Sequence, residues 1–178
     1  MRPSRSELEA DSWAFAVDIY ARPGVADACL NLQNEAGVDV MMLLVIAFTA
    51  VKLRLLLTPA EIRELDEACR HWREQIVWPL RAIRSGLKSG PLPAPNRETE
   101  QFRSKIKTVE LAAERLQNQL LVERLPQRPK AHVVTAEEVH TVLGCVVTLF
   151  VDKRASKPNA DLFPPIDKIV DAAMQAAR

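Results

Sequence analysis

The sequence predicts an all-α fold, a helical bundle of about six or seven helices built around a long antiparallel helical hairpin. Three observations predict it: capping patterns recur along the chain, apolar residues repeat at steps of three and four in two long segments, and only five of the 178 residues are glycine. The length and the 48% apolar fraction fit a single domain, 1–178. We expect N-terminal helices in 6–57, the hairpin in 58–125 and C-terminal helices in 135–177.

The first two helices are separated by a proline and a glycine. Ser6, with Glu9 three residues later, has the spacing of a capping box and predicts a helix that runs through Tyr20. Arg22-Pro23-Gly24 ends this helix. We expect Pro23 to serve as the first residue of the second helix, Val25 to Glu35, because a proline lacks only a donor that has no partner there.

The third helix is strongly apolar. Gly37 predicts a left-handed end to the preceding helix, and Asp39 predicts the N-terminal cap of the next. Residues 41–57 are interrupted by Lys52 and Arg54 after eleven apolar or near-apolar residues. This stretch is shorter than the roughly 20 residues that cross a bilayer. We therefore expect a buried central helix, and neither a membrane span nor a membrane partner.

Two long helices form the predicted hairpin. Thr58-Pro59-Ala60-Glu61 is a strong start signal for a helix from Pro59 to Leu87, with a kink near Gln75 to Trp78 because Pro79 lies inside it. Three prolines exclude regular structure from 89–96. The return helix is expected from Arg97 to about Leu125.

The C-terminal part contains two more expected helices. Thr135 and Glu138 form a second capping box, which predicts a helix to about Arg154. Residues 145–151 are rich in β-branched side chains, so a strand is the alternative there. The last helix is expected from Ile166 to Ala177.

Each long helix carries a row of mostly apolar residues that predicts how the two pack, a row called here the seam. In the register of a direct turn, Trp72 faces Ala113 and Cys69 faces Leu116, so that the largest side chain meets the smallest. The seam of the first helix is Ile62, Leu65, Cys69, Trp72, Ile76, Leu80, Ile83 and Leu87, and that of the second is Phe102, Ile106, Val109, Ala113, Leu116 and Leu120.

Charged residues follow the same register. Arg70 and Arg73 fall opposite Glu110 and Glu114, which predicts ion pairs between the helices. Arg81, Arg84 and Lys88 continue a basic stripe, and RNA binding through it is one alternative function. The net charge of +1 argues against a nucleic-acid partner, because proteins that bind nucleic acids usually carry a surplus of positive charge.

No complete catalytic or metal-binding set is recognisable. Glu137 and His140 have the spacing of half a di-iron site, which makes them a weak metal candidate, but no second half exists. Cys29 lies among apolar residues and is interpreted as a buried side chain, not a nucleophile. We expect no cofactor, and the assignment as an enzyme stays open, with the balance against it.

The three cysteines have neither zinc-ligand nor disulfide spacing, which favours a reducing, cytoplasmic location. Trp78 lies off the predicted seam, so it either packs beneath the N-terminal helices or marks a partner surface. The candidate partner surface comprises Trp78, His71, Arg84 and Lys88.

Several blocks of residues resemble a family of bacterial conserved hypothetical proteins that share a domain of unknown function. The resemblance covers about residues 12–125 and implies no activity. It suggests that five polar residues in otherwise apolar helices act together: Tyr20, Gln33, Asp39, Arg81 and Glu114. The blocks are Tyr20-Ala-Arg-Pro-Gly-Val25, Cys29-Leu-Asn-Leu-Gln33, Gly37-Val-Asp-Val40, Trp72-Arg73, Pro79-Leu-Arg81 and Glu110-Leu-Ala-Ala-Glu-Arg115.

Three functions follow as hypotheses. The leading one is a non-catalytic cytoplasmic module that binds another protein or its own copy, because the hairpin is longer than a compact domain needs. The second is a small-molecule or metal site formed by the five polar residues. The third is an RNA-binding accessory factor.

Overall fold

The computed structural model describes residues 4–128, 132–154, 158 and 160–177. This part of the chain forms helices and no strand, so the all-α prediction is confirmed and the strand alternative for 145–151 is wrong. The helices are α1 (Arg5–Tyr20), α2 (Val25–Ala36), α3 (Val40–Val51), α4 (Pro59–Trp72), the π-helical turn η1 (Arg73–Val77), α5 (Trp78–Gly86), α6 (Arg97–Glu123), α7 (Ala136–Asp152) and α8 (Phe163–Ala176).

Helix α3 lies at the centre of a helical body. Every residue from Met41 to Val51 is buried, and α1, α6, α7 and α8 all pack around it. Helix α8 returns to the N-terminal helices, where the Arg22 guanidinium donates to the carbonyl of Ala172 (2.9 Å). In the described residues no helix is long and apolar enough to cross a membrane.

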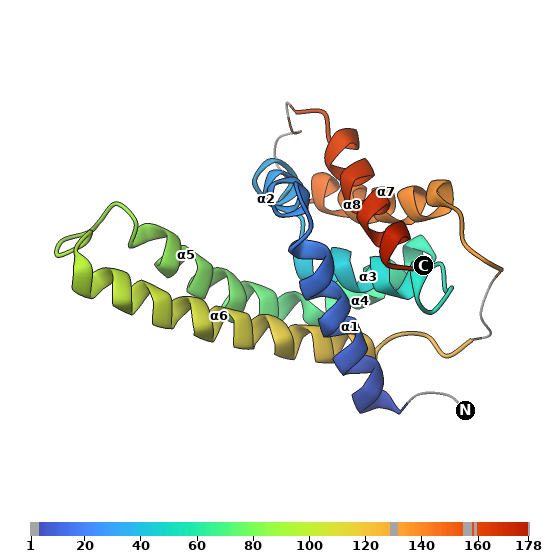
Figure 1. Ribbon diagram of the computed structural model, residues 1–178, viewed down its shortest axis with the longest axis horizontal. Helices are drawn as coiled ribbons and strands as arrows, with labels where there is room; N and C mark the ends of the chain where they lie inside the picture. The colour runs from blue at the N-terminus through green and yellow to red at the C-terminus, as the bar shows by residue number, and fades with distance from the viewer. Residues whose placement is uncertain (1–3, 129–131, 155–157, 159, 178) are drawn as a thin grey trace.

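The hairpin projects from this body (Figure 1). Helix α4 and the C-terminal half of α6 pack into the body, whereas α5 and the N-terminal half of α6 extend away from it as a two-helix arm. Helix α5 packs on η1 and α6. The Trp72 indole donates to the carbonyl of Ala113 (3.0 Å), which confirms that predicted contact.

Most predicted helix ends are confirmed because capping is a local interaction. Thr58 with Glu61 and Thr135 with Glu138 form capping boxes, and the Asp39 side chain accepts from the Met42 N–H. Gly37 ends α2 in the left-handed conformation (φ 70°), which costs a residue without a Cβ little.

Three predicted helix starts were wrong. The last helix begins at Phe163, not at Ile166, because the first turn of a helix tolerates prolines. Ser4 caps α1 together with Glu7, since this pair has the same spacing as Ser6 and Glu9 and lets the helix begin at Arg5. Pro23 does not open α2, because Gly24 in the left-handed conformation (φ 78°) is the capping residue and Val25 the first helical one.

The predicted seam is correct near the body and wrong along the arm. Ile62, Leu65 and Cys69 are buried as expected. On α6, however, Glu110 and Gln117 are buried, and their predecessors Val109 and Leu116 are half-exposed. The polar residues take the inner positions because charged side chains bond to them there. Arg81 and Arg84 bond to Glu110, and Asp39 accepts from Gln117. Ile76, Ile83 and Phe102, also expected in the seam, are exposed.

Candidate functional site

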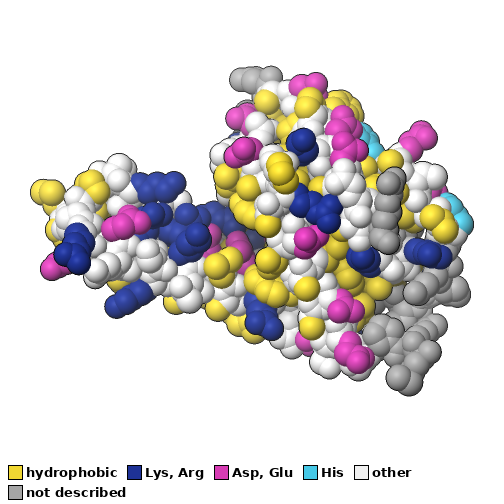
Figure 2. All heavy atoms as spheres, viewed as in Figure 1, with side chains coloured by type: hydrophobic (Ala, Val, Ile, Leu, Met, Phe, Trp, Pro, Cys, Tyr) yellow, Lys and Arg dark blue, Asp and Glu magenta, His cyan; other side chains and the backbone are white. Residues whose placement is uncertain are grey.

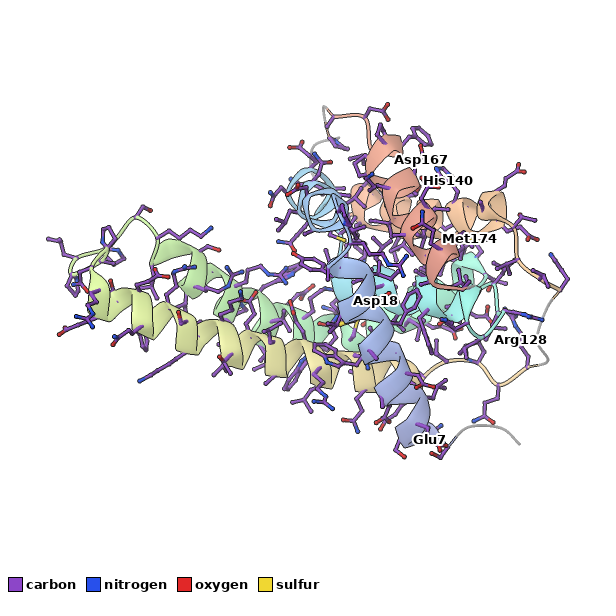
Figure 3. The ribbon with its side chains drawn as sticks, viewed as in Figure 1. Glu7, Asp18, Arg128, His140, Asp167 and Met174 are labelled. Carbon is purple, nitrogen blue, oxygen red and sulfur yellow. The ribbon has the colours of Figure 1, made fainter. Side chains whose placement is uncertain are left out.

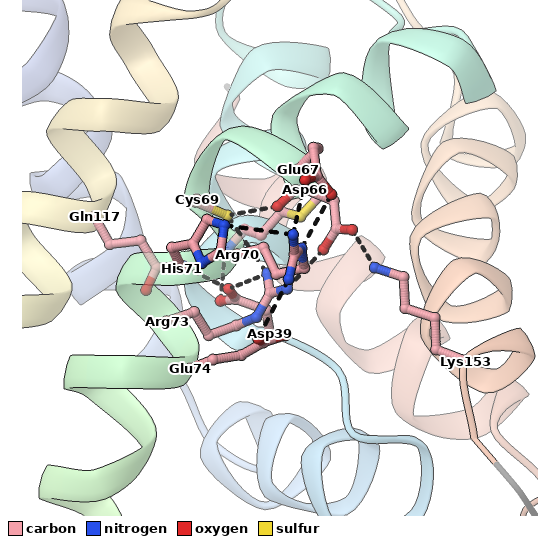
Figure 4. Close-up of polar contacts among 11 residues, drawn as sticks. Asp39, Asp66, Glu67, Cys69, Arg70, His71, Arg73, Glu74, Gln117 and Lys153 are labelled. Atoms are coloured by element: carbon pink, nitrogen blue, oxygen red, sulfur yellow. Dashed lines mark hydrogen bonds and ion pairs between the residues drawn. The ribbon is translucent and has the colours of Figure 1, made fainter.

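A buried ionic cluster joins the hairpin to the body (Figure 4). We call Arg73, Asp39, Asp66, Gln117 and Lys153 the Arg73 cluster. The Arg73 side chain, only 2% exposed, donates from Nη1 to Asp39 Oδ2 (3.1 Å) and pairs through Nη2 with Asp66 Oδ1 (2.9 Å). Gln117 donates to Asp39, and Lys153 pairs with Asp66. Two cations thus balance two carboxylates at a point where five segments of the chain meet.

The environment of Arg73 favours its charged form. Burial lowers the pKa of its guanidinium, but Asp39, Cys69 and Asp66 together raise the pKa above its ordinary value. The guanidinium also lies 5.1 Å from the centre of the Phe150 ring on α7. These ion pairs fix the base of the arm within the body, although Arg73 Nε and Asp66 Oδ1 are buried without a hydrogen-bond partner among the described residues.

A second ionic cluster lies where the arm leaves the body, and we call Arg81, Arg84, Gln33, Glu110 and Glu114 the root cluster. Arg81 donates to Glu110 Oε1 (3.0 Å), Glu114 Oε1 (2.6 Å) and, on α2, Gln33 Oε1 (2.6 Å). Arg84 also pairs with Glu110. These bonds tie α5 to α6 and to α2.

The pKa values of the two root carboxylates are shifted in opposite directions. Burial raises the pKa of Glu110, but hydrogen bonds from Arg84 and Arg81 outweigh it, and the pKa lies below its ordinary value. Burial also raises the pKa of Glu114, and Arg81 only partly opposes it, so this pKa lies above the ordinary value.

The predicted ion pairs of Arg70 and Arg73 with Glu110 and Glu114 are wrong. Arg70 pairs with Glu67 and Glu74 on its own helical segment, and Arg73 turns into the body. Side chains tilt toward the N-terminus of their helix. In an antiparallel pair this tilt brings the arginines of α5 and the glutamates of α6 toward each other, so Arg81 and Arg84 are the partners.

The structure brings three of the five predicted polar residues into direct contact. Gln33 and Glu114 both accept from Arg81. Tyr20 is near enough for Glu114 and Arg81 to influence its pKa, which burial raises above the ordinary value. Asp39 belongs instead to the Arg73 cluster, where it also caps α3.

An exposed apolar row lies along one flank of the arm, beside the residues that bond across the hairpin. We call Ile83, Phe102, Val109 and Leu116 the apolar stripe, and their exposed fractions are 49, 49, 51 and 53%. Arg84 and Glu110 bond across the hairpin. Ile83 and Val109 directly precede these two residues, and each is rotated by about 100° from its neighbour. Because the helices are antiparallel, both rotations lead to the same side of the hairpin.

The other expected sites have ordinary explanations. Cys29 is buried, and burial raises the pKa of its thiol to about 12. His140 lies 3.3 Å from Asp167 and stacks on Phe163, where α7 meets α8 (Figure 3). Within the described ranges no three His, Cys, Asp or Glu side chains are grouped to hold a metal ion. A groove of about 610 Å³, lined by Phe15, Phe48, Lys52 and their neighbours, contains none of the predicted site residues.

The predicted partner surface is only partly accessible. His71 and Lys88 are exposed and Trp78 is 41% exposed, but the guanidinium of Arg84 is engaged by Glu110. Charged side chains gather along the arm and at its junction with the body (Figure 2).

Sequence reasoning missed Asp66, Gln117 and Lys153. The only signal for Gln117 is that Glu110 and Gln117 are seven residues apart and so share one side of α6.

A family model described as "Protein of unknown function (DUF2390)" matches residues 11–121. The match covers more than half of the chain, so the protein belongs to this family, and the matched range includes α2 to α5 and most of α1 and α6. No curated protein and no solved structure is detectably similar to the chain.

Proposed function

We propose that this member of the family is a non-catalytic protein-interaction module that binds its partner along the arm. The observation that carries the proposal is the apolar stripe, four large side chains, each about half-exposed, on the two helices of the arm. Taking roughly 200 Å² for a large apolar residue, the stripe exposes about 400 Å². The largest exposed apolar patch of a single chain is commonly of this size and is often functional.

The two ionic clusters support the same role because they hold the arm in one orientation. The Arg73 cluster fixes its base within the body, and the root cluster ties it to α2. A rigid arm presents its surface without the entropic cost of ordering it during binding.

The geometry gives less support to the other two hypotheses. Arg81 and Arg84, two of the three residues of the RNA hypothesis, are engaged by Glu110 and Glu114. A small-molecule site would need polar groups free to bind a ligand, whereas Gln33, Arg81 and Glu114 are bonded to one another.

We also propose that the chain is one folding unit that works in the cytoplasm. The packing of α8 against α2 and α1 supports the single unit, and the three free thiols support a reducing compartment.

A photo-reactive amino acid placed at Val109 tests the proposed surface. Illumination of cells that produce the protein should yield a discrete cross-linked adduct from this position. Leu111 is the matched control, because it is 45% exposed on the same helix but lies about 160° round the axis from Val109.

The proposal predicts adducts at position 109 and none at position 111. Absence of adducts at both positions, or equal amounts at both, would refute binding through the stripe.

A further inference from the structure

The apolar stripe has a two-fold pattern on α6. Phe102, Val109 and Leu116 are seven residues apart, and all three are about half-exposed. If a second α6 lies antiparallel with the two Val109 residues at the centre, Phe102 of each copy meets Leu116 of the other. One row of residues is then complementary to itself, as an interface between two identical chains related by a two-fold axis requires.

The border of the stripe permits this pairing. Its outer edge on α6 includes Gln101, Ala112 and Gln119, which are uncharged, together with Lys105 and, near the two ends of the row, Glu98 and Glu123, all exposed. In the symmetrical pair Lys105 faces Ala112 and Ala113 of the other copy, and the two lysines are eight positions apart, about 12 Å along the axis. The lysines therefore do not oppose each other, whereas Glu98 of one copy comes within about 5 Å along the axis of Glu123 of the other at each end of the pair.

The opposite side of α6 is unlike this border. Leu111 lies there between Lys107 and Arg115, one turn away on either side, so a leucine of similar exposure has charged neighbours. The border also has no row of cations, since Lys105 is its one basic side chain among the residues named. An acidic or nucleic-acid partner is therefore a poor match for the stripe.

The area agrees with a stable dimer. Stable interfaces bury about 800 Å² on each partner, of which roughly 60% is non-polar. The stripe provides about 400 Å² of apolar surface per copy, and its polar border would contribute most of the remainder.

We propose that the protein is a homodimer in which two arms pack antiparallel through their apolar stripes, with Val109 on the two-fold axis. This inference rests on the proposed function, since it names a second copy of the chain as the partner of the same surface. The result is a four-helix arrangement in which the hairpin of α5 and α6 from one copy stacks on that of the other.

Sedimentation velocity of the full chain over a range of micromolar concentrations measures the association. We expect a dimer that Val109→Glu converts to a monomer at the same concentrations, whereas Leu111→Glu leaves it unchanged. Circular dichroism verifies that both variants stay helical. A dimer that resists Val109→Glu would overturn the proposed interface.

Cysteine cross-linking tests the register. In a Cys145→Ser background the remaining cysteines are buried. Val109→Cys should form an intermolecular disulfide on oxidation, because facing Cα atoms of packed helices are about 4 to 6 Å apart. Leu111→Cys should not.

Phe102→Cys and Leu116→Cys should each cross-link poorly alone, since like positions are about 21 Å apart, and should cross-link efficiently when mixed. Efficient cross-linking of either one alone would disprove the register.

Failure of this inference is distinguishable from failure of the proposed function. A chain that sediments as a monomer, yet gives a discrete adduct from position 109 whose mass differs from twice its own, binds a different protein there. That outcome overturns the dimer and keeps the interaction module.

Discussion

Arg73→Met removes the centre of the Arg73 cluster and should strongly destabilise the protein. Methionine keeps much of the volume of arginine but leaves Asp39 and Asp66 buried without their shared cation. Asp39 then retains only Gln117 and the N–H of Met42, and Asp66 retains Lys153. Removing one member of a buried ion pair typically costs 3–5 kcal/mol, because an uncompensated charge stays behind.

Urea unfolding followed by circular dichroism measures this loss. With a urea dependence of about 2 kcal/mol per molar, a loss of about 3–5 kcal/mol lowers the midpoint by roughly 1.5–2.5 M. Arg70→Met is the matched control, since Arg70 lies three residues earlier and pairs only on the surface. Its midpoint should stay close to that of the unmodified protein.

The reasoning attributes the loss to stranded carboxylates, not to lost packing. Adding Asp39→Asn and Asp66→Asn to Arg73→Met should therefore recover a large part of the midpoint, because the amides are neutral and asparagine can still cap α3. A triple variant less stable than Arg73→Met alone would refute this explanation, as would equal midpoints for Arg73→Met and Arg70→Met.

Two further predictions concern the root carboxylates and the thiols. Glu110 has a lowered pKa in the folded state, so the destabilisation by Glu110→Gln should be complete above pH 4.5 and shrink as the pH falls through that lowered value. Glu114 has a raised pKa, so Glu114→Gln should gain stability relative to the unmodified protein as the pH rises above 4.5; urea unfolding at several pH values measures both slopes, and parallel slopes would contradict the assignment. Cys145, which is partly exposed, should react with a thiol reagent in the folded protein, whereas Cys29 and Cys69 should react only after unfolding; mass spectrometry of the labelled chain identifies them, and rapid labelling of either buried thiol would contradict the packing.

Local interactions made the helices predictable. The capping boxes at Thr58 and Thr135 involve residues three positions apart, so the sequence contains all the information that they need. Ser6 was a wrong choice because Ser4 offers the same pattern two residues earlier. Where two equivalent local patterns compete, the outcome depends on how many residues the helix gains.

Long-range partners were not predictable in the same way. Asp66 and Lys153 are 87 residues apart, and neither has a sequence neighbour that indicates the other. On α6 the step of seven fits Val109 with Leu116 and also fits Glu110 with Gln117. Hydrophobicity selects the first row, but Glu110 is held inside by Arg81 and Arg84, and Gln117 by the carboxylate of Asp39.

The π-helical turn explains why the predicted seam of the first long helix is correct in α4 and fails beyond it. Pro79 has no N–H to donate, and in a regular α-helix its ring would crowd the carbonyl of Gln75. The π-helical turn η1 ends at Val77, two residues before this proline. One wide turn holds one extra residue, which rotates every later residue by about 100° relative to α4. The rotation turns Arg81 and Arg84 toward α6 and moves Ile83 from the seam to the flank. The widened turn therefore accounts for the arginines of the root cluster and for the exposure of Ile83, whereas Val109 and Leu116 are exposed on α6 because Glu110 and Gln117 take the inner positions.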